Sequence, residues 1–294
     1  MKTPPVCNYE GSDYQESFWE QGNRAYEDAA EELALKRLLP SGSGHLLELG
    51  AGAGRNTHRY KGFDRITLLD YSTTQLQRAI DRLGDDKKYR FVAADVYHMP
   101  FAPGVFSAAT MIRTLHHLAD PVIALEQINT CLFNSAVFIL EFANKRNIKS
   151  VFRYLFKKQD WNPFDRDQVE FVELNFNFHP ARVKEMLKQT RFLIKKQVSV
   201  SYLRTGFLKK TLPLSVMRVL EKMLQFSFSW SAYSPSIFLG TLVKNEIEAQ
   251  TDDIFFRCPA CGHFPLADTP PLLKCDQCGR EYPVENGIYD FRLD

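Results

Sequence analysis

The sequence of 294 residues lacks the features of several large protein classes. Its polar first residues, MKTPPVCNYEGSDY, carry no apolar segment of the kind found in secretory signals. A long uncharged stretch, Met223–Val243, contains several serines, Gln225 and Pro235, which make it a poor transmembrane candidate. A net charge of +2 gives no overall signature of a nucleic-acid-binding protein. These absences favour a globular protein with a substantial core, since 45% of its residues are apolar.

Cysteine is scarce, with six residues, and its placement is uneven. Cys7 and Cys131 are isolated, which fits free thiols in a reducing, cytoplasmic compartment. The remaining four form two Cys-x-x-Cys pairs, each followed by glycine: Cys258, Cys261, Cys275 and Cys278. Four thiolates at this spacing predict a tetrahedral Zn²⁺ site, which is structural because it leaves no open coordination position.

A glycine-rich turn organises the first half of the chain. Residues 46–54 read LLELGAGAG, so a short apolar strand with Glu48 in it precedes three glycines at alternate positions. Gly50, Gly52 and Gly54 are expected where the backbone takes positive φ or passes close to a ligand. A helix is expected to open near Arg55 and to present free N–H groups toward that ligand.

Two further apolar stretches end in an acid. Residues 65–70 end in Asp70 and residues 89–95 end in Asp95, and both acids are expected at the same sheet edge as the glycine turn. There Asp70 can accept hydrogen bonds from a ribose diol, and Asp95 can accept one from an adenine amino group. Strands are also expected over 105–115, 136–142, 192–200 and 236–243, and helices over 19–39, 72–83, from about 121, and over 212–228. This alternation predicts an α/β fold with a doubly wound, mostly parallel sheet.

Residues 25–143 resemble the core of class I S-adenosylmethionine (SAM) methyltransferases of the small-molecule, type 11-like group. The resemblance lies in the motifs Glu48-Leu-Gly-Ala-Gly-Ala-Gly54, Leu69-Asp70, Ala94-Asp95 and Arg113-Thr-Leu-His-His-Leu118. It implies a Rossmann-like seven-stranded sheet within a domain at 1–250, with SAM as the methyl donor. It also implies a set of cofactor-binding residues: Glu48, Gly50, Ala51, Gly52, Gly54, Arg55, Asp70, Tyr71, Asp95, Val96 and Arg113.

The same resemblance suggests where an acceptor would be activated. His116 and His117 follow the fourth strand, and one of them is the candidate to orient or deprotonate the acceptor, with helix capping or packing as the alternative for each. Arg113 is expected either to hold an acidic group of the acceptor or to pair with Glu141. Asn144, Lys145 and, less strongly, His179 are expected near the same region.

Residues 144–190 form an insertion in which this family usually builds its acceptor site. Within Phe142–Gln159 there are six basic residues and no acid, and apolar side chains recur at helical spacing. The helix either packs its apolar face on the core or contacts an anionic acceptor, an anionic membrane surface or RNA phosphates. Aromatic loops at 161–164 and 175–180 are expected to roof the acceptor pocket.

The last forty residues resemble a second family. Residues 254–293, through the segment Glu281-Tyr-Pro-Val-Glu-Asn-Gly-Ile-Tyr-Asp-Phe291, are similar to Trm112-like zinc domains, which bind and activate methyltransferases. The resemblance implies a small β-rich zinc ribbon at 251–294. We expect it to dock on the methyltransferase domain and stabilise or activate it; an exposed adaptor for another protein is the alternative. The acidic charge of this segment disfavours binding to nucleic acid.

Three functions remain open from the sequence. The first is a SAM-dependent methyltransferase acting on a small, lipid-like or anionic acceptor. The second is an RNA methyltransferase, which the basic insertion supports and which the near-neutral charge and the missing Asn/Asp-Pro-Pro-Tyr motif oppose. The third is a non-catalytic SAM-binding scaffold that acts through its zinc domain.

Overall fold

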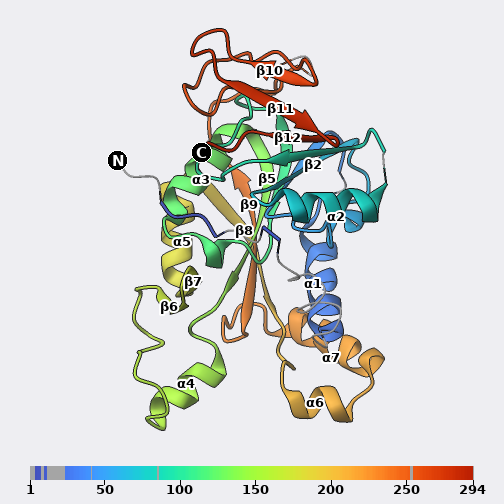
Figure 1. The fold of residues 1–294 in the computed structure, drawn as a ribbon. Coiled ribbons are helices and arrows are strands. Elements are labelled where there is room, and N and C mark those ends of the chain that lie inside the picture. The colour runs from blue at the N-terminus through green and yellow to red at the C-terminus, as the bar shows by residue number, and fades with distance from the viewer. Residues whose placement is uncertain are drawn as a thin grey trace.

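The computed structural model describes residues 4–7, 10–11, 24–40, 42–84, 86–251 and 254–293 (Figure 1). A ten-stranded sheet runs through the molecule in the order β10-β11-β12-β3-β2-β1-β4-β5-β9-β8. The first helix, α1 (Ala25–Leu38), lies within the range expected for it, of which residues 19–23 fall outside the described residues.

Seven of these strands form the predicted doubly wound sheet. Five of them run parallel to one another: β1 (His45–Leu49), β2 (Arg65–Asp70), β3 (Tyr89–Ala93), β4 (Phe106–Met111) and β5 (Leu132–Ala143). β9 (Ser236–Val243) pairs antiparallel with both β5 and β8 (Phe192–Val200). The expected antiparallel last strand is therefore confirmed.

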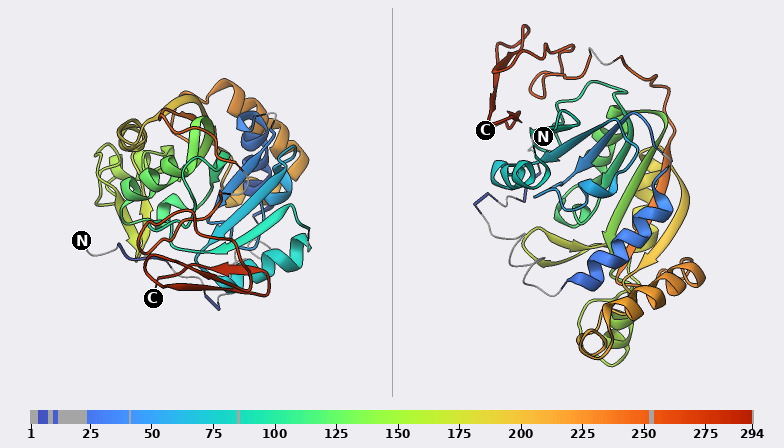
Figure 2. Two further views of the ribbon diagram at one scale, coloured as in Figure 1. Left: turned by 90° about the horizontal axis from the view of Figure 1, so that it is seen from above. Right: turned by 90° about the vertical axis from the view of Figure 1, so that its right-hand side faces the viewer.

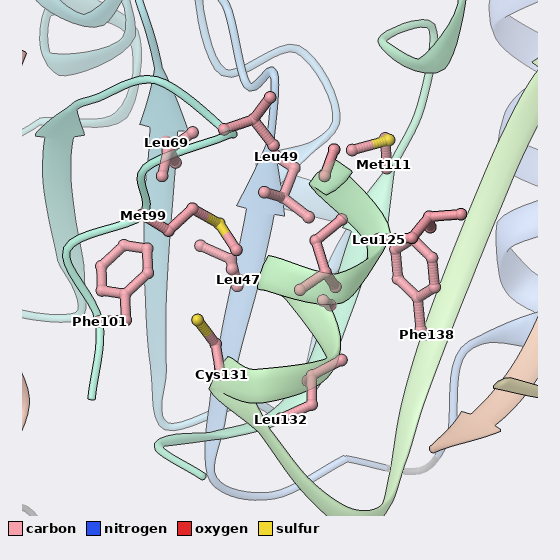
Figure 3. Packing of buried hydrophobic residues seen from close by; sticks show 14 of the residues in the cluster. Leu47, Leu49, Leu69, Met99, Phe101, Met111, Leu125, Cys131, Leu132 and Phe138 are labelled. Carbon is pink, nitrogen blue, oxygen red and sulfur yellow. The ribbon is translucent and has the colours of Figure 1, made fainter. Parts of the chain in front are cut away.

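Side chains alternate between two hydrophobic clusters, one on each face of the sheet. On one face, Leu47 and Leu49 of β1 pack with Leu125 of α3 (Pro121–Cys131) and Phe138 of β5 (Figure 3). The other face buries residues of α1 and α2 (Thr73–Leu83) against Leu46 and Ile66. The edge where the parallel strands end is thus held rigidly from both sides.

The chain after β1 differs from expectation. No α-helix opens near Arg55; a single 3₁₀ turn, η2 (Thr57–Arg59), is formed instead. Gly50, Gly52 and Gly54 all have positive φ, which keeps the backbone out of the right-handed helix until residue 55. Gly62 then turns the chain into β2, so only one helical turn fits. The prediction of a helix that opens near Arg55 and directs its free N–H groups toward a ligand is therefore wrong.

The insertion and the segment before β9 also depart from expectation. α4 (Ile148–Leu155) is shorter than the basic helix predicted, and its apolar side chains are exposed instead of packed on the core. It is followed by the hairpin β6 (Val169–Val172) and β7 (Asn175–Asn177) and by α5 (Pro180–Gln189). α6 (Gly206–Thr211) and α7 (Leu214–Ser227) follow β8, and α7 confirms the helix predicted there. Figures 1 and 2 place α4, α6 and α7 together at the end of the molecule remote from β10–β12.

The C-terminal segment extends the sheet, so the expected seven strands become ten. It supplies β10 (Leu272–Lys274), β11 (Glu281–Glu285) and β12 (Ile288–Asp290). β12 pairs parallel with β3, Ile288 opposite Phe91, and the Phe291 amide donates to the Ala93 carbonyl at 2.8 Å. β3 would otherwise expose an unpaired edge. A division of the chain at residue 250 stays a prediction.

Aromatic packing fastens this segment to the rest of the chain. Phe256 stacks on Phe101 with ring centroids 6.3 Å apart, and the Arg90 guanidinium lies over the Phe255 ring at 4.3 Å. The buried cysteines Cys258 and Cys275 belong to the same hydrophobic cluster as β1. Among the described helices, none combines the length and apolarity needed to cross a membrane.

Candidate active site

A cavity lies where β1, β2 and β4 end at the carboxyl edge of the sheet. It is lined by nine of the eleven predicted cofactor residues: Glu48, Gly50, Ala51, Gly52, Arg55, Asp70, Tyr71, Val96 and Arg113. The remaining two, Gly54 and Asp95, do not line it. Of the two candidate histidines, His117 lines it and His116 does not.

The three glycines of the turn have different tasks. A Cβ on Gly50 would overlap the side chain of Thr114, so this position tolerates only glycine. A Cβ on Gly52 would meet no atom within 4 Å, because this residue faces the open cavity. A Cβ on Gly54 would lie 3.1 Å from Leu83, so this glycine allows α2 to pack closely. The turn therefore leaves a cradle at Gly52 in which a ligand fits.

Asp70 is fixed beside this cradle. Its Oδ2 accepts a hydrogen bond from the Gly52 amide at 2.8 Å, and its Oδ1 accepts one from the Ser72 amide at 3.0 Å. Burial raises the pKa of Asp70, while these backbone N–H groups oppose the rise. The Tyr71 amide is a third backbone donor to this carboxyl group. A carboxylate has about four lone-pair sites, so an acceptor position remains for a hydroxyl group of a diol.

Asp95 behaves differently from its prediction. Its Oδ1 accepts from the Tyr97 amide at 2.9 Å, and its Oδ2 lies 3.1 Å from Nδ1 of His98. The side chain is therefore turned into its own loop, and its neighbour Val96 faces the cavity instead. The expected contact from Asp95 to an adenine amino group stays a prediction that this geometry does not support.

Glu48 reaches the cavity wall within a buried chain of hydroxyl groups. Its carboxyl accepts from Thr57 Oγ1 at 2.6 Å and from Tyr60 Oη at 3.2 Å, and Thr110 Oγ1 donates to Tyr60 Oη at 3.0 Å. Burial raises the pKa of Glu48 to about 7. The side chain holds the base of the turn in place.

A buried ion-pair cluster positions the two arginines of the cavity. Arg55 pairs with Asp28 and with Glu31, and Nε of Arg113 donates to the same Glu31. Burial alone would raise the pKa of Glu31, but the neighbouring guanidinium groups of Arg113 and Arg55 lower it. The acids lie on one face of α1, which sequence reasoning had not linked to the site. Acids spaced three residues apart on a buried helix are the signal that could have found them.

Arg113 meets Glu141 through its backbone. Its φ is 55°, and its amide donates to Glu141 Oε2 at 2.8 Å, while its guanidinium turns to α1. Glu141, Asn144 and Lys145 do not line the cavity, and Asn144 instead bonds the carbonyls of Ala232 and Ser234. The expectation that these three face the acceptor is not supported.

The structure separates the two histidines. His117 Nδ1 lies 3.1 Å from the carbonyl oxygen of Leu174, which can only accept, so Nδ1 carries the proton. In the neutral ring, Nε2 is then the nitrogen with a lone pair. Burial lowers the pKa of His117, so the ring is neutral at physiological pH. The ring of His116 packs 4.0 Å from that of His117, and burial lowers its pKa well below the usual value.

The insertion contributes no described residue to the cavity lining, and it meets the cavity wall only where the Leu174 carbonyl contacts His117. Phe176 and Phe178 are buried in the core, and no residue of 161–164 or 175–180 lines the cavity. His179 caps α5, since its Nδ1 accepts from the Ala181 amide at 3.2 Å. The predicted aromatic roof is therefore not formed.

The four cysteines of the C-terminal segment converge. All four sulfurs lie within 4.8 Å of one another, with 3.7 Å between Cys258 and Cys278 and 3.6 Å between Cys261 and Cys275. Tetrahedral zinc with bonds of about 2.3 Å requires sulfur separations of about 3.8 Å, so this set fits Zn²⁺. Gly262 and Gly279 follow the pairs with positive φ and donate to the carbonyls of Cys258 and Cys275, each at 2.8 Å.

The C-terminal segment also touches the cavity wall. Arg292 lies over the ring of Tyr71 at 5.8 Å and contacts Glu10 at 3.7 Å. Glu10 in turn accepts from the amides of Thr73 and Thr74 at the start of α2. The C-terminal segment, the N-terminal segment and the cavity are therefore physically linked.

Comparison with known proteins explains this arrangement. A model of the family described as "Methyltransferase domain" matches residues 47–140, which contain the glycine turn, Asp70 and His117. Over these residues the chain is similar to SAM-dependent methyltransferases. The motif resemblance and the fold class expected from the sequence are thereby confirmed.

Two curated relatives match over about a third of the chain. A demethylmenaquinone methyltransferase from Chlamydia trachomatis is 32% identical over 87 residues, which are 29% of this chain and 38% of the relative. An O-methyltransferase from Penicillium expansum is 32% identical over 97 residues, 31% of this chain and 35% of the relative. The chain thus spans less than two fifths of the length of these relatives.

Two solved structures share the fold of the methyltransferase domain. One belongs to a Haloferax volcanii complex between the Trm112 methyltransferase activator and a putative methyltransferase, with 16% identity, TM-score 0.55, and coverage of 79% of this chain and 96% of that chain. The other is a Thermotoga maritima SAM-dependent methyltransferase described as a possible histamine N-methyltransferase, with 17% identity, TM-score 0.54, and coverage of 78% and 98%. At these identities the likeness concerns the fold alone.

Proposed function

We propose that the protein transfers the methyl group of SAM to a small, lipid-like acceptor. The observation that carries the proposal is the convergence of Asp70, the open cradle at Gly52 and the neutral ring of His117 on one cavity. Much of its wall is apolar, contributed by residues such as Leu49, Leu69 and Ile112. Relatives named demethylmenaquinone methyltransferase support a lipid-like acceptor.

The cavity suits the donor in several ways. Asp70 would bind the ribose hydroxyls, and the glycine turn would allow the backbone to approach the ligand closely. SAM supplies a methyl group that its sulfonium already activates. What the chain must add is alignment of the acceptor, which a rigid cavity between two hydrophobic clusters provides.

His117 is the residue proposed to act on the acceptor. Its Nδ1–H is held by the Leu174 carbonyl, which fixes the ring orientation, and Nε2 is the nitrogen that would act on the acceptor. Because its pKa is lowered, the ring needs no prior deprotonation at neutral pH. A hydroxyl or enol acceptor would lose its proton to this nitrogen as the new bond forms.

The C-terminal segment is proposed to be a structural zinc domain of the Trm112-like kind that stabilises the methyltransferase domain. Its four cysteines would hold Zn²⁺ with no open position. The pairing of β12 with β3 and the contact between Arg292 and Tyr71 support this role, because both join the segment to elements of the cavity.

The acceptor class can be tested with SAM labelled in its methyl group. Purified zinc-replete protein is incubated with the labelled donor and with the lipid, small-molecule and RNA fractions of a cell extract. Label that enters the organic-solvent fraction supports the proposal. Label found only in RNA favours an RNA methyltransferase, and no transfer from protein that binds SAM favours a non-catalytic scaffold.

A further inference from the structure

Apolar side chains are exposed in unusual number at one end of the molecule. On α4 these are Ile148, Phe152, Leu155 and Phe156, and on α6, α7 and the following loop the most exposed are Phe207, Met223, Phe226 and Trp230. Phe226 and Trp230 keep 81% and 78% of their surface in water. We call these eight residues the apolar tip. Clusters of exposed apolar side chains of this kind mark an interaction site.

The apolar tip lies at the carboxyl edge of the sheet. α4 follows β5 where Ala143 pairs with Ser236, the first residue of β9, so α4 and the loop before β9 share this edge. The Ile148 amide donates to the Tyr233 carbonyl at 2.9 Å, and the Arg146 guanidinium lies 4.8 Å from the Tyr233 ring. Figure 1 shows α4 on one side and α6 with α7 on the other side of the same end of the molecule. The cavity opens from the same edge.

Basic residues outnumber acidic ones in the two sequence segments that carry the apolar tip. Residues 146–158 contain five basic residues and no acid, and residues 204–230 contain five basic residues and one acid. That acid, Glu221, is fully buried and accepts from Tyr26 Oη at 2.5 Å. Arg204 and Lys209 pair with Glu27 of α1, and Arg218 pairs with Glu32. The basic charge of the apolar tip therefore comes mainly from residues 146–158.

This combination selects one occupant. A second copy docked through a two-fold axis would bring basic surfaces together, which repels. Single-stranded RNA stacks on aromatic rings, but the aliphatic Ile148, Leu155 and Met223 offer no stacking face. A bilayer with anionic headgroups satisfies both features, because apolar side chains enter the acyl boundary while lysine and arginine remain among the phosphates.

We propose that the apolar tip inserts into the interface of an anionic lipid bilayer. Binding of this kind is independent of methyl transfer. It also places the carboxyl edge of the sheet, and with it the cavity, next to the lipid phase.

The test uses the full zinc-replete chain with vesicles of phosphatidylcholine alone or mixed with phosphatidylglycerol. Co-flotation is expected with the mixed vesicles only, and added salt should weaken it. In a W19F/W161F background, the emission of Trp230 should shift to the blue when mixed vesicles are added, because the indole leaves water. Absence of flotation with anionic vesicles at low salt overturns the proposal.

Two pairs of variants separate the contribution of the basic residues to membrane binding from that of the apolar side chains. K149E/R153E/K158E should weaken partition on the order of 100-fold, while the matched control K61E/K87E/K195E, which changes charge equally at exposed sites elsewhere, should stay near wild type. F226S/W230S should abolish flotation, and L193S/L272S should not. Equal loss in a variant and its control would contradict the proposal. So would sedimentation showing a dimer that F226S/W230S dissociates, or a salt-sensitive gel shift with RNA without vesicle binding.

Discussion

At the scale of single residues, His116 and His117 show that residue type alone does not decide which side chain can act in the cavity. Neighbouring residues of the same type receive different surroundings, because one ring faces the cavity and the other packs behind it. Only His117 has a partner that fixes its protonated nitrogen at Nδ1. The sequence placed both near the acceptor, and no spacing rule could separate them, since the partner Leu174 is 57 residues away.

Replacing His117 tests this distinction. Asparagine keeps an N–H donor near the position of Nδ1 and removes Nε2, so H117N should retain SAM binding and lose about 10²- to 10⁴-fold in kcat. H116N, the matched control, should keep kcat within a few-fold of wild type. The measurement is single-turnover methyl transfer to the labelled fraction as a function of pH. Equal losses in H117N and H116N would contradict a role for Nε2.

Glu48 gives a second prediction at this scale. Burial raises its pKa to about 7 from 4.5, so the folded state holds the proton more tightly than the unfolded chain. Its contribution to stability is complete below pH 4.5 and is lost as the pH rises through 7. E48Q removes the buried charge and should raise the free energy of unfolding at pH 8 by about 1–3 kcal/mol, with a smaller gain at pH 5.

Urea unfolding of zinc-replete protein at both pH values measures this difference. E126Q on the exposed face of α3 is the control and should change neither value. A loss of stability in E48Q that is the same at pH 5 and pH 8 would show that the carboxyl contributes only hydrogen bonds.

At the scale of elements, the repeating pattern of the sheet was accessible from the sequence. β2, β8 and β9 have the predicted bounds, because apolar periodicity acts locally. Of Ser72 and Thr73, the two candidate caps of α2, the structure selects Ser72. The missing helix after β1, the acids of α1 behind Arg55, and the pairing of β12 with β3 were not predicted. The last two depend on contacts between residues distant in the chain, for which no local pattern exists, whereas the missing helix follows from the positive φ of nearby glycines.

The added strands give a prediction about zinc. Because Cys258 and Cys275 belong to the same hydrophobic cluster as β1, loss of the metal should destabilise more than the C-terminal segment. Removal of Zn²⁺ by a chelator should lower the Tm of the whole chain by several degrees and expose the edge of β3 to hydrogen exchange. C261S, which removes one exposed ligand, should resemble the chelated protein. An unchanged Tm with normal protection of β3 would contradict a stabilising role.

At the scale of the whole molecule, the cavity and the apolar tip share the carboxyl edge of the sheet, while β10–β12 lie at the end of the molecule remote from the tip. The C-terminal segment still reaches the cavity wall, because Arg292 lies over the ring of Tyr71. This arrangement accounts for a methyltransferase domain extended by both an insertion and a C-terminal segment. The central claim is that the cavity holds SAM through Asp70.

Calorimetric titration of SAM and of its demethylated product into zinc-replete protein tests that claim most directly. Asp70→Ala should abolish binding, while Asp81→Ala, an exposed acid on α2, should leave it unchanged, provided that both variants keep the wild-type Tm. Binding that is unaffected by Asp70→Ala, or no binding by the folded wild-type protein, would contradict the account.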